Sequence, residues 1–166
     1  PIAVIIGYFV IALSGVAISI RSDNPIVSFM GYNLVVLPVG VVLSIGLTEY
    51  ETVSILNACI VTAGVTAIMV VASAIKPELF LSIGKTLLTC LTGVVVIEGI
   101  TLLLGIYMPT IWDLLVAILF CGYIGYDWAK AQEKLKTVDN AVDSCVELYL
   151  DIINLFIRIL ATSDDD

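Results

Sequence analysis

Two carboxylates set in apolar sequence are the residues best suited to chemistry. Asp127 follows the run CGYIGY, and Asp151 lies in the middle of the next apolar segment, VDSCVELYLDIINLFIRIL. Two carboxylates in one low-dielectric site do not both ionise cheaply, so such a pair can hold a proton at mildly acid pH and release it near neutral pH. Carboxylate oxygens also suit a hard cation such as calcium. The pair therefore predicts a proton-sensitive site that binds calcium transiently.

The segment from Val142 to Leu160 carries a polar stripe on one helical face. The stripe consists of Glu147, Asp151, Asn154 and Arg158, and Asp143 extends it by one turn. These spacings repeat with the helical period. A charge near the centre of a bilayer costs ~2.5 to ~17 kcal/mol, depending on the method of measurement. We therefore expect this helix to lie inside a bundle, with its polar face toward other helices or water.

Four further polar residues are candidates for an ion path or for contacts between helices. Glu98 lies in the apolar sequence VVVIEGITLL, either as a second carboxylate on a cation path or as a carboxyl kept neutral. Asn154 can donate and accept hydrogen bonds between helices, as polar side chains do in membranes. Arg158 lies two turns from Asp151, so we expect it to meet Asn154, another helix or the outer interface. Glu147 belongs to the same group of candidates.

The composition indicates an integral membrane protein. Of the 166 residues, 60% are hydrophobic and 13% are charged, whereas a soluble domain is about half apolar and a quarter charged. The chain has no histidine and no zinc-binding pattern, and its four scattered cysteines are expected to be small buried hydrophobes. We expect calcium, protons and membrane lipid as partners, with protein partners undefined. We expect no nucleic acid, no bound cofactor and no enzymatic activity.

Six apolar runs approach or exceed the length of a membrane-spanning helix, which is roughly 17 to 25 residues. The runs are Pro1–Ile20, Ile26–Leu47 with Pro38 inside it, Val53–Ile75, Leu79–Ile106, Ile111 to about Tyr126, and the stripe segment. They predict an all-α helical bundle with six visible transmembrane helices, in a single domain over residues 1–166. Asp127 is expected to close the fifth helix, and roughly residues 128–143 are expected to form a turn.

The loops predict the orientation. Loops one, three and five carry all of the loop lysines and arginines, namely Arg21, Lys76, Lys130, Lys134 and Lys136. Loop two and loop four carry none, so the positive-inside rule places the odd-numbered loops in the cytoplasm and both ends of the chain outside. An outside N-terminus without Met predicts a missing upstream helix, making seven, although a six-helix protein with its N-terminus outside is an alternative. The short loops favour a bacterial plasma membrane.

The two aspartates lie in motifs that resemble a known family. Tyr126-Asp127 and the sequence Leu148-Tyr149-Leu150-Asp151-Ile152-Ile153-Asn154-Leu155-Phe156 are similar to the signature of the transmembrane Bax inhibitor motif family. The resemblance implies a seven-helix bundle with the last helix at its centre. It implies a pH-sensitive calcium leak in which the aspartate pair is sensor and gate, and Arg21 matches a basic residue that pairs with the two carboxylates in some members.

The chain also departs from the bacterial relatives in this resemblance. They carry a glutamate in the helix that ends at the position of Arg21, whereas Ile2 to Ile20 contains no acidic residue. Their arginine in the last helix lies further along than Arg158. The alternative interpretation of Arg21 is an anchoring charge at the cytoplasmic side.

Two other functions fit parts of the pattern. An intramembrane aspartyl protease also places Tyr-Asp on one helix and an aspartate on the next. However, such enzymes carry Gly-x-Gly-Asp and Pro-Ala-Leu motifs, and neither occurs here. A membrane-embedded regulatory protein without transport could use the basic segment after Asp127 to contact anionic lipid or a partner. We expect the passive cation leak.

Overall fold

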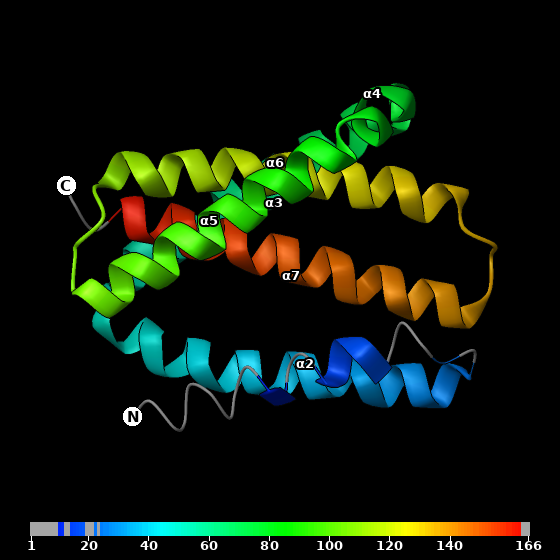
Figure 1. Cartoon of the computed structure of the whole chain (residues 1–166), viewed down its shortest axis with the longest axis horizontal. Coiled ribbons are helices and arrows are strands. Elements are labelled where there is room, and N and C mark those ends of the chain that lie inside the picture. Colours follow the sequence, from blue (N-terminus) through cyan, green and yellow to red (C-terminus); the bar gives the residue numbers. More distant parts are fainter. Residues whose placement is uncertain (1–9, 12–13, 19–21, 23, 164–166) are drawn as a thin grey trace. The chain divides into compact units, whose positions relative to one another are not determined.

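The computed structural model describes residues 10–11, 14–18, 22 and 24–163, and in this part the regular structure is helical, with no strand. Figure 1 shows the order of the helices. They are α2 (Pro25–Gly46), the short 3-10 helix η1 (Leu47–Glu49), α3 (Thr52–Ile75), α4 (Pro77–Ser82), α5 (Gly84–Leu104), α6 (Thr110–Glu133) and α7 (Val138–Thr162). The all-α class predicted from the sequence is therefore correct.

Among the described residues, four helices are long and apolar enough to cross a membrane. They are α2 together with η1, then α3, α5 and α6. The prediction of six visible spans is therefore not confirmed. The first predicted run, Pro1–Ile20, falls mostly outside the described residues. The last, α7, has 25 residues, but its acidic and basic side chains make it more polar than the other four.

Two predicted boundaries need correction. The run Leu79–Ile106 is broken at Ile83 into the short helix α4 and the spanning helix α5. Asp127 does not close a helix, because α6 continues to Glu133. The residues after Asp127 include Ala, Lys, Gln and Glu, which are good helix formers, so the helix extends past the apolar run. The connection to α7 is then only residues 134–137.

Local sequence signals explain several helix ends. The side chain of Asn24 accepts a hydrogen bond from the Ile26 N–H at 3.0 Å, and Pro25 occupies the first turn of α2. An N-cap oxygen and an early proline are standard ways to begin a helix. Helix α5 ends at Gly105, whose φ of 65° is a left-handed conformation that glycine adopts without strain. Pro38 lies inside α2 without ending it.

The chain forms two compact units. The first contains residues Pro1–Glu51 and Glu133–Tyr149, and the second contains Thr52–Gln132 and Leu150–Asp166. Helix α7 contributes its first half to the first unit and its second half to the second. Asp127 and Asp151 both belong to the second unit. One domain over residues 1–166, and a last helix at the centre of the bundle, stay predictions.

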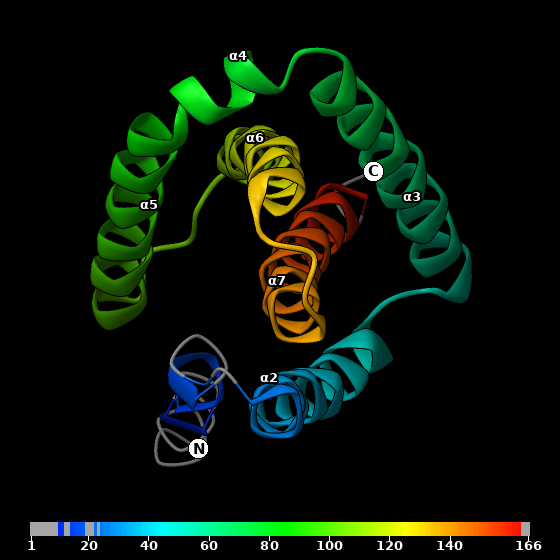
Figure 2. The same ribbon diagram turned by 90° about the vertical axis from the view of Figure 1, so that its right-hand side faces the viewer.

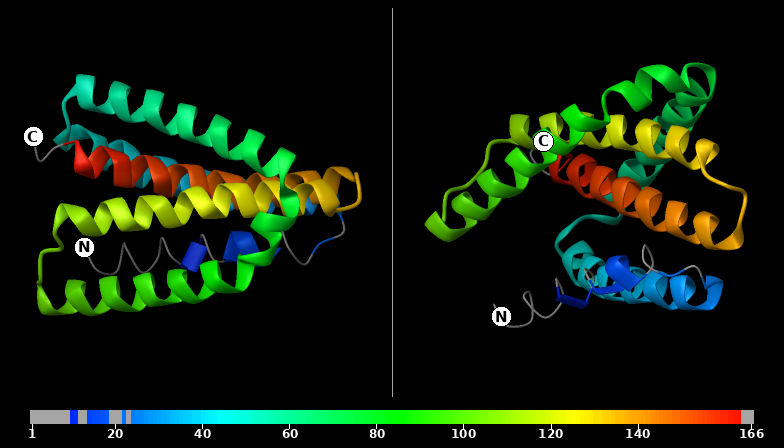
Figure 3. Two further views of the ribbon diagram at one scale, coloured as in Figure 1. Left: turned by 90° about the horizontal axis from the view of Figure 1, so that it is seen from above. Right: turned by 45° about the vertical axis from the view of Figure 1, so that its right-hand side comes forward.

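The second unit is built around α6. Figure 2 shows α3 and α5 on opposite sides of α6, with α4 joining them. The left panel of Figure 3 shows that α3 and α6 run in the same direction and α5 in the opposite one. A Cβ at any of three glycines would overlap a neighbouring side chain: Gly84 with Tyr126, Gly122 with Leu87, and Gly125 with Phe80. Small residues therefore let α4 and α5 approach α6 closely, as is common in membrane bundles.

The first unit joins α2 to the first half of α7. Near the start of both helices, Ser28 Oγ donates a hydrogen bond of 2.6 Å to Asp139 Oδ1. Further along, the rings of Tyr32 and Tyr149 meet edge to face, with centroids 6.4 Å apart. These contacts place the beginnings of α2 and α7 at the same end of the unit. This agrees with loops one and five lying on one side of a membrane.

Candidate functional site

The predicted aspartates are the two buried carboxylates among the described residues. Asp127 is 7% exposed and Asp151 is 6% exposed. Asp127 belongs to the buried face of α6 that also holds Val116, Phe120 and Ile124. This spacing is that of one helical face, so the carboxylate lies among apolar core side chains. Both carboxylates are therefore in the low-dielectric surroundings that the sequence predicted.

Tyr123 is a further buried polar residue within electrostatic range of both aspartates. It lies one turn before Asp127 on α6, and the carboxylates of Asp151 and Asp127 both act electrostatically on its hydroxyl. The hydroxyl oxygen is buried and makes no hydrogen bond with any part of the chain that the structure describes. The arrangement is a buried polar group of two carboxylates and one phenol, drawn from α6 and α7. Sequence reasoning missed Tyr123, because it reads as one more aromatic in an apolar run.

A lysine lies beside Asp127. The Lys130 Nζ is 3.8 Å from Asp127 Oδ1 and 5.9 Å from the centroid of the Tyr126 ring. The Lys130 side chain is 36% exposed, so water screens this ion pair. Arg21, the predicted partner of the pair, lies outside the described residues, and its role stays a prediction.

Arg158 joins three helices of the second unit. Its NH1 donates to Asp113 Oδ1 of α6 at 2.7 Å, and its NH2 donates to Glu98 Oε1 of α5 at 2.5 Å. Trp112 Nε1 donates to the same Glu98 oxygen at 3.0 Å. Arg158 thus meets other helices, one of the alternatives that the sequence left open. Glu98 is an ionic partner here, whereas the sequence suggested a neutral carboxyl or an ion-path carboxylate. Asp113 was not predicted.

The other two stripe residues have different surroundings. Glu147 belongs to the first unit, where its Oε2 accepts a hydrogen bond of 3.1 Å from Lys134 Nζ. Lys134 lies in the short connection before α7, so this ion pair ties that connection to the helix. The Asn154 Nδ2 donates to Leu150 O of its own helix at 2.7 Å. Roles for Glu147 and Asn154 in an ion path, and for Asn154 between helices, stay predictions.

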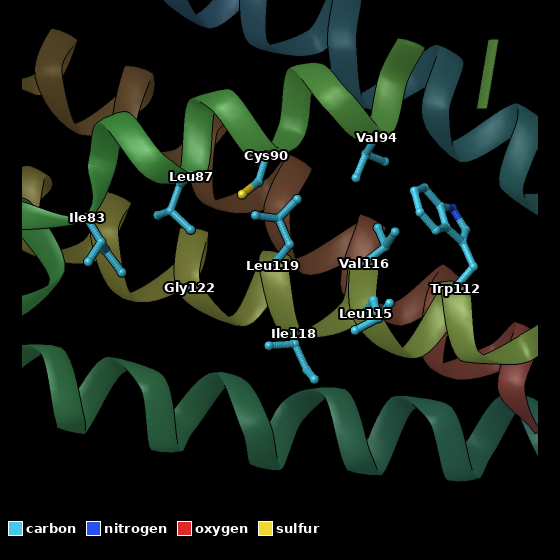
Figure 4. Close-up of a pocket in the computed structure, with 10 residues that line it drawn as sticks. All are labelled: Ile83, Leu87, Cys90, Val94, Trp112, Leu115, Val116, Ile118, Leu119 and Gly122. Carbon is cyan, nitrogen blue, oxygen red and sulfur yellow. The ribbon is translucent and has the colours of Figure 1, made fainter. Parts of the chain in front are cut away.

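An apolar groove of about 500 Å³ separates parts of α5 and α6. Figure 4 shows the side chains of Leu87, Cys90 and Leu119 in it, with Ile83 near one end and Trp112 near the other. No lining residue carries a charge, so the groove offers nothing to hold a cation.

Comparison with known proteins gives the family. The family described as inhibitor of apoptosis-promoting Bax1 (Bax1-I) matches residues 1–162, nearly the whole chain. The chain belongs to this family. The resemblance seen in the motifs around Asp127 and Asp151 is therefore correct.

Curated relatives of this Bax1-I family chain include LIFEGUARD proteins of Arabidopsis thaliana. LIFEGUARD 3 is 46% identical over 34% of this chain and 23% of its own length. LIFEGUARD 4 is 37% identical over 42% of this chain and 30% of its own length. LIFEGUARD 2 is 40% identical over 34% of this chain and 23% of its own length. The chain thus matches less than a third of the length of these relatives. No solved structure matches it.

Family membership and four apolar helices together make this chain a multi-pass membrane protein. The curated relatives described here are plant proteins, so they lend no support to the bacterial plasma membrane predicted from the short loops. The orientation of the loops in the membrane stays a prediction.

Proposed function

We propose that this Bax1-I family protein is a passive cation leak that prefers calcium and is gated by protonation of Asp127 and Asp151. The observation that carries the proposal is the burial of these two carboxylates in one compact unit, on consecutive helices. Ionisable side chains inside membrane-spanning segments are energetically costly and therefore rare. Two buried carboxylates in such a segment indicate a functional site by default.

The charge state of the pair sets the direction of the pH response. With one or both carboxylates ionised, the site is negative and attracts a cation. With both protonated, the attraction is lost and the helices can pack without a charge between them. Flux should therefore rise with pH as protons leave the pair. Calcium takes six to eight oxygen ligands, so two carboxylates hold it only together with water, which suits an ion in transit.

The test is calcium uptake into dye-loaded lipid vesicles that contain the purified chain, from about pH 5 to 8. We expect uptake to rise with pH in the parent and to lose its pH dependence in Asp127→Asn and in Asp151→Asn. Glu133→Gln is the matched control, because it removes an exposed carboxylate from the same helix. It should keep the pH dependence of the parent.

Three outcomes would count against the proposal. Uptake that neither Asp127→Asn nor Asp151→Asn changes would make the aspartates structural. No uptake at any pH by correctly folded protein would favour the membrane-embedded regulatory protein without transport. Cleavage of a transmembrane peptide that Asp151→Asn abolishes would instead favour the intramembrane aspartyl protease.

A further inference from the structure

Two threonines of α3 differ from Thr89 and Thr92 of α5 in their hydrogen bonding. Thr89 and Thr92 of α5 donate to carbonyl oxygens one turn back in their own helix, at 3.0 and 2.8 Å. This local bond is the usual one for threonine in a helix. Thr62 and Thr66 make no hydrogen bond within the described part of the chain, although both Oγ1 atoms are buried. Thr62 is only 4% exposed.

These threonines share one face of α3 with Ser73. The offsets from Thr62 to Thr66 and to Ser73 are four and eleven residues, which is a single helical stripe. We call the three side chains the hydroxyl face of α3. Ser73 is fully buried and its Oγ donates to Gly125 O of α6 at 2.6 Å. Gly125 lies between Tyr123 and Asp127, so the hydroxyl face meets α6 at the turn that carries the candidate site.

A buried hydroxyl without a partner is unfavourable, and in native proteins nearly all such groups bond to protein or to ordered water. Among its described residues the second unit contains three of them, at Thr62, Thr66 and Tyr123. Two lie on the hydroxyl face of α3, and the third lies one turn before Asp127 on α6. Water is the partner that can satisfy all three, because it both donates and accepts. The apolar groove between α5 and α6 offers no comparable polar groups.

We propose that the hydroxyl face of α3 lines a hydrated track that begins at the aspartate pair. At 1.5 Å per residue, Thr66 and Thr62 lie about 10 and 16 Å from Ser73 along the helix. Since α3 and α6 run in the same direction, the track leads from Asp127 toward the end of the unit where α6 begins (Figure 3). Its occupants are water and a partly hydrated cation, whose lost water ligands the threonine oxygens replace. The cation is the part of this inference that rests on the proposed function.

The track can be tested by the reactivity of introduced thiols in lipid vesicles. The background variant replaces the native cysteines by alanine, at Cys59, Cys90, Cys121 and Cys145. Thr62→Cys and Thr66→Cys are compared with Ile60→Cys and Ile68→Cys, which lie two residues away on the exposed face of the same helix, at 62% and 66% exposure. The probe is a charged methanethiosulfonate reagent, which reacts with thiolates in water.

We expect the two threonine positions to react at least about tenfold faster than the two isoleucine positions. Equal rates at the paired positions, whether fast or slow, would overturn the hydrated track. Circular dichroism and a single elution peak in detergent select the variants that fold. Thr62→Ser and Thr66→Ser keep the hydroxyl, so they serve as controls for whether a change at these positions disturbs folding.

Calcium uptake separates this inference from the proposed function. Thr62→Val and Thr66→Val remove the hydroxyl with little change of shape, so they should lower uptake severalfold but leave its pH dependence intact. The serine variants should restore uptake. Fast thiol reaction without any uptake would keep the track and reject the leak. If neither Thr62→Val nor Thr66→Val changes calcium uptake, and the cysteines introduced at these positions do not react, the leak is retained and the hydrated track is rejected.

Discussion

At the scale of single residues, Arg158 neutralises two acids that come from different helices. Its guanidinium bonds Glu98 and Asp113 through separate nitrogens, and its side chain is only 19% exposed. Planar, multiply hydrogen-bonded pairing is what arginine provides and lysine does not. Removing the cation would leave two acids of the same sign close together in a poorly hydrated place.

We therefore expect Arg158→Met to lower the free energy of unfolding by about 2–3 kcal/mol, less than for a fully buried pair because water reaches part of the cluster. Lys130→Met removes a cation that is 36% exposed and should cost less than about 1 kcal/mol. Denaturation of both variants in the same detergent measures the difference. Adding Asp113→Asn to Arg158→Met should recover part of the loss, and an Arg158→Met protein as stable as its parent would show that the cluster contributes nothing.

At the scale of elements, the packing of α6 depends on glycine. Gly122 and Gly125 face Leu87 and Phe80 so closely that an added Cβ would overlap them. Gly93 of α5 has open space around its Cα instead. Glycine therefore allows close packing at positions 122 and 125 of α6, whereas Gly93 of α5 has no packing role.

Gly125→Leu should consequently destabilise the protein by about 1–3 kcal/mol or more, because overpacking forces neighbouring elements apart. Gly93→Leu, the control at an exposed position of α5, should change stability far less. A double-mutant cycle with Phe80→Ala tests the mechanism. The two changes should be less than additive if Phe80 is the side chain displaced, and strict additivity would show that the strain lies elsewhere.

At the scale of the whole molecule, the charge pattern predicts the sidedness of the chain. The Ser28–Asp139 hydrogen bond holds the starts of α2 and α7 together, as expected if the loops before them share one side. Those loops carry lysine and arginine, and the connection between α5 and α6 carries neither. The positive-inside rule then puts residues 134–137 in the cytoplasm and residues 105–109 outside.

Thiol labelling of intact cells tests this orientation. In the background without native cysteines, Tyr107→Cys should react with an impermeant reagent added outside, since Tyr107 is 86% exposed. Thr137→Cys should react only after the membrane is permeabilised. The reverse pattern would mean that the chain is inverted, and that the charged loops do not set its orientation.

The sequence predicts a feature well when the residues that reveal it are neighbours in the chain, and poorly when they are far apart. Asp127 and Asp151 stand out because each is an acid in apolar sequence, and the structure does bury both. Asp113 does not stand out, because an acid in the first turn of a helix is ordinary, and its partner Arg158 is 45 residues away. The break at Ile83 was hidden for a similar reason. Residues 79–106 are apolar enough on average that hydropathy alone reads them as one helix.

The bond from Ser73 to Gly125 has a mechanical consequence for α6. In a regular helix the carbonyl of Gly125 already accepts from the N–H of Ala129, so the serine hydroxyl competes for the same oxygen. Competition of this kind, together with two glycines within one turn, is a recognised cause of helix bending. The stretch that carries Asp127 is therefore a place where α6 can bend, and a tilt of the turns after Gly125 would reposition that carboxylate.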